Sequence, residues 1–425
     1  MRGMIQVPDG WEVKKLGEIA KFKGGDGFSE EYQGLTSGDF PFLKVSDLSL
    51  LRNEKYIKEA NNYVDQSTKE SLKYTVFPAY TIVFAKVGAA LLLNRRRILT
   101  KNSIIDNNMM GMTVKNNFSL DYLYFVMLSI DFADFVQTGA LPSINQETIS
   151  NVSILIPKEK KEQEKIAKIL STLDKAIEST NRLIEKEKNI KTALMQELLT
   201  NGIDKNGQIR SPQTHTYKQS ELGLIPDEWE VVNLGKCISN NGDYGINAPA
   251  VDFSYSLPTY LRITDIDEDG HFIDCNKKSV DDLESADYFL YDGDIVFART
   301  GNTTGKTYLY NPKDGKLVFA GFLIRFTPNS RKLIPQYLKA VTETSNYWAW
   351  VETNSARTGQ PGINANEYKR FKFTLPAIEE QKQIAKILTT QDKKIQIEKT
   401  NLAKLKELKK GLMNDLLSGK VRVKI

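Results

Sequence analysis

The stretch PKEKKEQEKIAKILSTLDKAI (157–177) is repeated near the C-terminus as PAIEEQKQIAKILTTQDKKI (376–395). An offset of 218 residues separates Ile166 from Ile384 in the shared IAKIL. The same offset pairs VPDGWEVKKLG (7–17) with IPDEWEVVNLG (225–235), and LKVSDL (43–48) with LRITDI (261–266). Repeat units of solenoid proteins span only about 20–50 residues, so this much longer repeat predicts two tandem domains.

Each copy of the repeated stretch predicts a long helix. Pro157 is expected to open the first one, because proline is tolerated in a first turn. The apolar positions are close to a heptad stripe, with polar interruptions at Thr180, Glu187, Gln391 and Glu398. Since roughly 33 residues of helix span about 50 Å, longer than a domain of this size needs, we expect the helices to pair. The positions expected to pair are Ile166, Leu170, Leu173, Ile177, Ile184, Leu194, Leu198, Ile384, Leu388, Ile395, Leu402, Leu405, Leu412 and Leu416.

The other segments predict two similar α+β domains, related as a pseudo-two-fold internal repeat and separated by the two helices as an antiparallel coiled coil. Strand-like runs include TIVFAKV (81–87), VSILIP (152–157) and LVFAGFLIRF (317–326), and helical stretches cover 120–136 and 335–351. We expect the first domain at 1–157, the first long helix at 158–202, a polar linker at 203–221, the second domain at 222–376, and the second long helix with its tail at 377–425.

Composition limits the classes of protein to which the chain can belong. The net charge of +5 permits a nucleic-acid partner without arguing for one, because only a clustered positive face would do so. Cys237 and Cys275 form no CxxC motif, and His215 and His271 are the only histidines, so we expect neither a metal site nor a disulfide framework. No apolar run approaches the roughly 18 residues of a membrane span, and the expected location is the cytoplasm.

The motif GNTTGKT (301–307) follows the strand-like run DIVFA and resembles a phosphate-binding loop. That loop requires G-x-x-x-x-G-K-[ST], and Thr300 stands where its first glycine must be, so we reject a nucleotide-hydrolysing site. Arginine can bridge guanine and asparagine can bridge adenine, while threonine and lysine suit phosphates. The loop therefore favours a polar, flexible contact surface, although an ordinary solvated hairpin is an equally good interpretation from the loop alone.

In the first domain, Lys86 and Gly88 take the places of Arg299 and Gly301, but the polar loop is absent. Three consecutive arginines, residues 95–97, more often mark a solvated edge than a site, because arginine is costly to bury. If DNA is the partner, these arginines are the strongest electrostatic candidates in that half. An adenine methyltransferase motif is lacking, since the only Asn-Pro is Asn311-Pro312, followed by Lys313.

Taken in order, these segments resemble the specificity subunit of Type I restriction-modification enzymes. The resemblance covers essentially the whole chain: P-D-x-W-E-V twice, LKVSDL and LRITDI, VFAKVG and VFARTGNTTGK, ALPSINQETI and GQPGINANEYKR, and two E-x-Q-x-x-I-A-K-I-L helices. It implies two target-recognition domains, each reading one half of a split, asymmetric DNA target, in a subunit without catalytic residues. Arg299, Gly301, Gly305 and Lys306 fit the family's R-x-G-x-x-x-G-K loop.

The resemblance also implies partners and sites. The helices and the adjoining domain surfaces would set the spacing of the half-sites and dock two modification subunits, and through these the restriction subunits. S-adenosylmethionine, ATP and magnesium would be bound by those partners, with no cofactor or metal in this chain. The competing interpretations are a coiled-coil scaffold that binds protein and a self-contained enzyme. The candidate DNA-binding residues are Arg299, Thr300, Asn302, Thr303, Thr304, Lys306, Lys86, Arg95, Arg96, Arg97, Lys44, Ser46 and Arg262.

Overall fold

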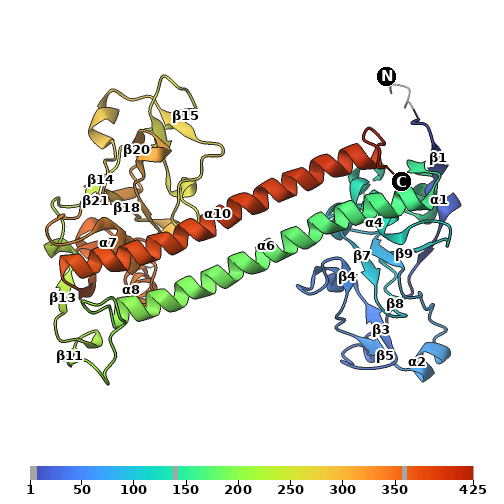
Figure 1. Cartoon of the computed structure of the whole chain (residues 1–425), viewed down its shortest axis with the longest axis horizontal. Helices are drawn as coiled ribbons and strands as arrows, with labels where there is room; N and C mark the ends of the chain where they lie inside the picture. Colours follow the sequence, from blue (N-terminus) through green and yellow to red (C-terminus); the bar gives the residue numbers. More distant parts are fainter. Residues whose placement is uncertain (1–6, 137–141, 357–360, 425) are drawn as a thin grey trace. The chain divides into compact units, whose positions relative to one another are not determined.

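The computed structural model of the chain describes residues 7–136, 142–356 and 361–424. The chain forms two compact units, which are described separately: unit 1 comprises residues 1–181 and 400–425, and unit 2 comprises residues 182–399. Both long helices, α6 (Lys160–Thr200) and α10 (Ile378–Leu417), run from one unit into the other (Figure 1). Each unit therefore contains one domain and one half of each long helix.

Unit 1 is built on a five-stranded sheet with the order β2-β9-β6-β7-β4, accompanied by the smaller sheets β5-β3-β8 and β1-β10. The strand bounds are β1 Trp11–Lys15, β2 Ala20–Gly24, β3 Phe40–Leu43, β4 Tyr56–Ile57, β5 Tyr63–Val64, β6 Ile82–Ala85, β7 Arg96–Leu99, β8 Ile104–Ile105, β9 Met109–Val114 and β10 Ser153–Pro157. The short helices are α1 Leu16–Ile19, α2 Gln66–Ser71, α3 Ala89–Leu92, α4 Leu120–Ser129 and α5 Gln146–Ser150.

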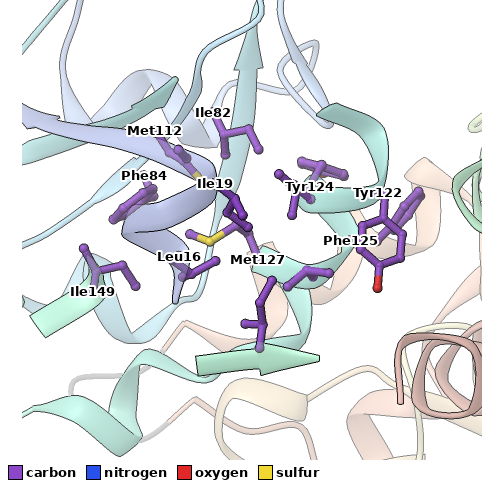
Figure 2. Close-up of a cluster of buried hydrophobic side chains, with 14 of the residues drawn as sticks. Leu16, Ile19, Ile82, Phe84, Met112, Tyr122, Tyr124, Phe125, Met127 and Ile149 are labelled. Atoms are coloured by element: carbon purple, nitrogen blue, oxygen red, sulfur yellow. The ribbon is translucent and has the colours of Figure 1, made fainter. Parts of the chain in front are cut away.

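The core of unit 1 lies between the five-stranded sheet and α4 (Figure 2). Phe84 of β6 and Met112 of β9 contribute from the sheet, and Phe125 contributes from α4. The same cluster includes Ile166 at the start of α6 and Leu416 at the end of α10. Burial of these apolar side chains at about 25 cal/mol per Å² is the main driving force that holds the helix ends to the sheet.

Unit 2 repeats this plan with two four-stranded sheets, β14-β21-β18-β19 and β15-β17-β16-β20, and the pairs β11-β12 and β13-β22. The strand bounds are β11 Tyr217–Ser220, β12 Gly223–Pro226, β13 Glu230–Asn233, β14 Asp243–Tyr244, β15 Ala250–Asp252, β16 Thr259–Leu261, β17 Lys278–Val280, β18 Ile295–Ala298, β19 Thr307–Leu309, β20 Leu317–Phe319, β21 Leu323–Phe326 and β22 Lys372–Leu375. The helices are α7 Pro335–Val341, α8 Ser345–Ser355 and α9 Ala365–Tyr368.

Four sequence predictions of local structure are corrected. The run 317–326, predicted as one strand, is two strands, β20 and β21, joined by a turn at 320–322. The stretch 335–351 contains two helices rather than one, and α4 ends at Ser129. Pro157 does not open the helix, because it pairs with Trp11 as the last residue of β10.

Each domain is closed by the same pairing of its first and last strands. β1 pairs antiparallel with β10 in unit 1, and β13 pairs antiparallel with β22 in unit 2. This pairing brings each opening tryptophan to the start of the long helix that follows the last strand. Trp11 donates its indole N–H to Glu162, and Trp229 donates its indole N–H to Glu380, both at 3.2 Å.

Within each unit the two helix halves run antiparallel. In unit 1, Lys409 of α10 pairs with Asp174 of α6, while the segment after α10 reaches Glu162. In unit 2, Gln391 lies beside Glu187, and Glu380 lies beside Gly202. Both helices end at glycines in the left-handed region, Gly202 at φ 67° and Gly419 at φ 69°, a conformation that favours glycine.

Burial along the helices follows the apolar stripe. Eight of the fourteen predicted positions are buried and the other six are half-buried. The buried positions are Ile166, Leu170, Ile184, Leu198, Ile384, Leu388, Ile395 and Leu416. The half-buried positions are Leu173, Ile177, Leu194, Leu402, Leu405 and Leu412.

Two of the predicted polar interruptions contact each other in unit 2. Gln391 is 4% exposed and donates from its side-chain amide to the backbone oxygen of Glu187, at 3.0 Å, and to the Glu187 carboxylate, at 2.6 Å. The repeat offset places leucines, Leu173 and Leu405, at the equivalent positions of unit 1. These two interruptions in the stripe therefore form a polar pair across the helix interface of one unit.

The segment predicted as a linker, 203–221, is a folded part of unit 2. Ile203 is 3% exposed and packs in the core, and Tyr217–Ser220 forms β11. Arg210 pairs with Glu380 through both of its terminal nitrogens. The absence of an apolar period misled the prediction, because two well-placed side chains anchor this segment.

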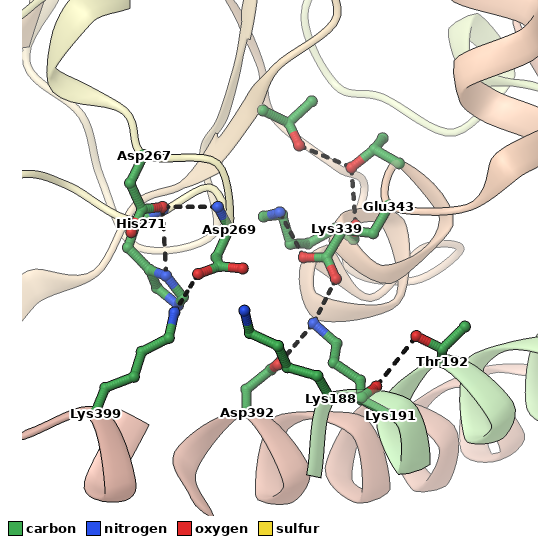
Figure 3. A network of polar contacts seen from close by, with 12 residues as sticks. Lys188, Lys191, Thr192, Asp267, Asp269, His271, Lys339, Glu343, Asp392 and Lys399 are labelled. Atoms are coloured by element: carbon green, nitrogen blue, oxygen red, sulfur yellow. Dashed lines mark hydrogen bonds and ion pairs between the residues drawn. The ribbon is translucent and has the colours of Figure 1, made fainter. Parts of the chain in front are cut away.

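A charged network joins both helix halves to the domain in unit 2 (Figure 3). Lys191 of α6 pairs with Glu343 at 2.5 Å and with Asp392 of α10 at 2.6 Å. Lys339 of α7 pairs with the same Glu343 at 2.6 Å. Burial raises the pKa of Glu343, but the two ammonium groups outweigh burial and leave that pKa below its ordinary value.

No helix in the described ranges is both long enough and apolar enough to span a membrane.

Candidate nucleic-acid interface

In unit 2, several strand ends meet around Arg299, the residue after β18. The Arg299 backbone N–H donates to the oxygen of Phe322 at 3.0 Å, in the turn between β20 and β21. In the same turn, Gly321 donates to Ile246 after β14, at 2.8 Å, and Ala320 donates to Leu261, the last residue of β16, at 3.0 Å. These bonds bring three loops and the strand-end cation into one cluster.

Unit 1 contains the same backbone arrangement around Lys86, the residue after β6. The Lys86 N–H donates to the oxygen of Asn108 at 2.8 Å. Asp106 donates to Leu43, the last residue of β3, at 2.9 Å, and Asp26 donates to Ile105 at 2.9 Å. Lys86 therefore occupies the place of Arg299, as the sequence comparison predicted.

A further pair of equivalent contacts closes both clusters. Gly88 donates to the oxygen of Pro142 at 2.7 Å, and Gly301 donates to the oxygen of Pro361 at 2.9 Å. Both glycines have positive φ, 76° and 70°, which explains why glycine is found at these turns. The runs ALPSINQETI and GQPGINANEYKR each begin outside the described residues.

The polar loop of unit 2 is more ordered than predicted. Gly301–Thr303 forms one 3-10 turn, and Thr304 is buried, with its hydroxyl donating to Gly301 at 2.7 Å. The Thr303 hydroxyl donates to Thr300 at 3.3 Å, and Thr300 is half-buried. Lys306 is held by Glu268 at 2.6 Å. Most of the expected donors are thus used within the loop, whereas Asn302 is exposed.

The arginine run of unit 1 is corrected at Arg96. Its side chain is fully buried, stacks 3.8 Å from the Phe132 ring centroid, and donates to the oxygen of Ile130 at 2.6 Å. Burial lowers the pKa of Arg96 to about 10, so the guanidinium still carries its charge near neutral pH. Because the aromatic face and the backbone oxygens occupy it, Arg96 cannot contact DNA in this conformation.

The neighbours of Arg96 are partly accessible. Arg97 is half-buried and donates to the backbone oxygen of Asn53, and burial lowers its pKa. Arg95 is half-buried and donates to the hydroxyl of Ser49. Since Phe84 of β6 pairs with Arg96, Arg95 lies near the strand end that carries Lys86.

The remaining candidates lie at equivalent turns in the two units. Lys44 and Arg262 each donate a backbone N–H to the aspartate three residues on, Asp47 at 2.7 Å and Asp265 at 2.9 Å. The Arg262 guanidinium is also paired with Asp265, which raises the pKa of Arg262. These aspartates explain the shared D of LKVSDL and LRITDI as a turn-forming residue. Ser46 is exposed.

Sequence reasoning missed four residues of the clusters. Asn107 and Asn108 are exposed beside Lys86, and Tyr244 and Phe322 are 41% and 56% exposed beside Arg299. One sequence signal could have located the turns of these clusters: Ile105 and Phe319 end matching strands, β8 and β20, and the turns follow them directly. Insertions shift the repeat offset in this region, which concealed that equivalence.

Unit 2 also contains a group of potential metal ligands, Asp267, Asp269 and His271. The Lys399 ammonium already pairs with Asp269, and the Asp267 carboxylate accepts the backbone N–H groups of Asp269 and His271 at 2.9 and 2.8 Å. The group is therefore a hydrogen-bonded turn linked to α10. It adjoins a solvent-open hollow of about 290 Å³ that the network of Lys191 also lines.

Comparisons with known proteins agree with the duplicated architecture. The family described as "Type I restriction modification DNA specificity domain" matches the chain twice, over residues 8–188 and 226–407. The chain therefore belongs to the family of Type I restriction-modification DNA specificity subunits.

Relatives over nearly the whole length include the MjaVIII specificity subunit of Methanocaldococcus jannaschii. It is 27% identical, with 99% of this chain and 95% of the relative covered. The EcoBI specificity subunit of Escherichia coli is 21% identical, with 91% of this chain and 80% of the relative covered. A crystal structure of an S subunit from M. genitalium shares the fold, with a TM-score of 0.60, 13% identity and 98% coverage of both chains.

Proposed function

We propose that each unit reads one half of a split, asymmetric double-stranded DNA target with its strand-end cluster. The observation that carries this proposal is one backbone arrangement built twice with different side chains. Unit 1 presents Lys86 beside Asn107 and Asn108, whereas unit 2 presents Arg299 beside Tyr244 and Phe322. Arginine and asparagine are the side chains suited to guanine and adenine in the major groove, so unlike clusters suit unlike half-sites.

The paired helices would set the gap between the half-sites and dock two modification subunits, through which restriction subunits join. An ion pair that is repeated between the helices supports two similar docking surfaces. Lys191 pairs with Asp392 in unit 2 at 2.6 Å, and Lys409 pairs with Asp174 in unit 1 at 2.5 Å. Repeated surfaces suit identical partners. In this proposal the chain is non-catalytic and acts in the cytoplasm, while the partner subunits bind S-adenosylmethionine, ATP and magnesium.

A methylation map tests the proposal. DNA is sequenced for adenine methylation in cells that express the chain with an adenine methyltransferase subunit, and in cells that express the methyltransferase subunit alone. We expect a split motif with a fixed gap only when both are present. An assembled complex that adds no methylation would overturn the DNA-reading role and favour a protein-binding scaffold.

A salt titration gives a second test on the purified complex. Binding to DNA should weaken steeply with added salt, with a slope that reflects the number of neutralised phosphates. Arg299→Ala should relax one half-site and leave the other strict, with a cost of about 1–3 kcal/mol if Arg299 contacts guanine. Uniform loss on all sequences would instead assign Arg299 to the phosphates.

A further inference from the structure

The Arg299 side chain lies over an aromatic ring at the surface of unit 2. Its guanidinium carbon is 4.9 Å from the ring centroid of Tyr244, the last residue of β14. Strand β21 pairs with both β14 and β18 and lies between them in the sheet order, so the arginine side chain reaches across one strand to the ring. A terminal nitrogen of Arg299 also donates to the oxygen of Gly321 at 3.4 Å.

The Tyr244 ring is itself fixed. Its hydroxyl accepts the backbone N–H of Ala365, the first residue of α9, at 3.1 Å. The backbone of Tyr244 pairs with Ile324 in β21. With the backbone held by a strand and the hydroxyl held by a helix start, the ring has one orientation beneath the guanidinium.

The charge of Arg299 is less neutralised than that of its neighbours. Lys306 pairs with Glu268, Arg262 pairs with Asp265, and Arg325 pairs with Asp243. Within the ranges that the structure describes, no carboxylate forms an ion pair with Arg299. An aromatic face attracts a cation without neutralising it, so the Arg299 donors that do not bond to Gly321 stay available for an external acceptor.

Unit 1 lacks this stack. Gly24 ends β2 at the position where Tyr244 ends β14, and a Cβ added to Gly24 would lie 2.8 Å from the Lys86 ammonium nitrogen. A side chain at this position would therefore displace the Lys86 ammonium group from its present place. In unit 1 the cation is the ammonium group of a flexible lysine, Lys86, whereas in unit 2 it is the planar guanidinium of Arg299, which stacks on a fixed tyrosine ring.

We propose that Tyr244 is a positioning residue that orients Arg299 for two-point recognition of a guanine in the half-site read by unit 2. The inference rests on the proposed function and deepens it. Arginine reads guanine by donating to O6 and N7 together, and this requires the guanidinium plane to be aligned with the base. A stack on a fixed ring restricts that plane before DNA binds, which lowers the ordering cost of the contact.

The test uses the assembled complex with its methyltransferase subunit and compares Tyr244→Leu with Tyr244→Phe. Methylation rates are measured on the wild-type target and on targets with single base changes in each half-site. We expect Tyr244→Leu to lower the rate on the wild-type target about twofold to fivefold, the range of an exposed cation–π contact. The loss of discrimination should fall at one G·C pair, and Tyr244→Phe, which keeps the ring, should retain it.

Two controls separate this role from a structural one. Tyr291→Leu changes a 65% exposed tyrosine before the opposite end of β18 and should leave rates and discrimination unchanged. In the Arg299→Ala background, Tyr244→Leu should add no further loss. Equal defects in Tyr244→Phe and Tyr244→Leu would assign the effect to the Ala365 hydrogen bond and overturn the inference, as would unchanged discrimination. Absence of any methylation by the wild-type complex would instead refute the proposed function.

Discussion

Arg422 and Glu162 form a two-point ion pair in unit 1, with Nε 2.7 Å from Oε1 and Nη2 3.0 Å from Oε2. Glu162 is 1% exposed and also accepts the indole N–H of Trp11. In unit 2, Arg210 and Glu380 make the equivalent pair beside Trp229. Each glutamate lies in the first turn of a long helix, and each arginine follows the end of the other helix. In each unit, the segment that follows one long helix is therefore bound to the first turn of the other long helix.

Removal of Arg422 should destabilise unit 1. Arg422→Ala leaves the buried Glu162 carboxylate with fewer donors, and an unsatisfied buried acceptor costs about 1–3 kcal/mol. Urea unfolding followed by fluorescence measures this loss. Lys420→Ala, an exposed change in the same tail, is the matched control. Equal unfolding midpoints for Arg422→Ala and the wild type would show that the ion pair does not stabilise the unit.

Replacing both Gln391 and Glu187 by leucine should destabilise the protein less than replacing Gln391 alone. Gln391→Leu alone removes the amide that satisfies Glu187 and should cost about 1–3 kcal/mol. Adding Glu187→Leu recreates the two leucines found at the equivalent positions of unit 1, and apolar replacement of a partly buried polar pair is often neutral or stabilising. Urea unfolding of the two single variants and the double variant gives the coupling. Additive losses would contradict the pairing.

The duplicated helices and their buried stripe were predictable because a repeat of 218 residues and a 3.5-residue apolar period are properties of the sequence itself. The pairing of Gln391 with Glu187 was not, since the sequence shows only two interruptions in separate helices. The role of Arg210 could not be predicted from the sequence for the same reason. An ion pair with Glu380, 170 positions away, leaves no local pattern.

The strand-end cations of the candidate site were predictable in position but not in surroundings. Lys86 and Arg299 follow matching strands, so their equivalence could be read from VFAKVG and VFARTG. Tyr244 and Phe322 reach Arg299 from other strands, and strand order is set by long-range pairing that no local motif records. Arg96 reversed its expected exposure because the ring of Phe132 offers a buried guanidinium a favourable partner.

Arg96 should therefore affect stability rather than DNA reading. Arg96→Ala removes a fully buried large side chain and should cost about 2–5 kcal/mol, as other large-to-small core changes do. Arg96→Met fills much of the space and removes a buried charge whose Nε has no hydrogen-bond partner among the described residues, so it should cost less. Thermal unfolding of the two variants checks this order.

The methylated motif separates the two roles. At a temperature where Arg96→Met remains folded, its complex should methylate the same motif as the wild type. Lys86→Ala, at the strand end of the same unit, should instead weaken methylation without lowering the unfolding temperature. A changed motif in Arg96→Met would return this residue to the candidate interface.

His271 should make the stability of unit 2 depend on pH. A hydrogen bond to Asp267 raises the pKa of His271, although burial opposes the shift, and the pKa of Asp267 is lowered to about 2. The raised pKa of His271 means that its stabilisation is complete below about pH 6.5, the ordinary histidine value, and is lost as pH rises through the raised pKa. Because both side chains are more than one-third exposed, solvent screening limits the effect to about 0.2–1 kcal/mol. The urea unfolding midpoint should therefore fall with rising pH more in the wild type than in His271→Gln. The control variant His215→Gln should follow the wild type. Parallel pH curves for the wild type and His271→Gln would refute the link.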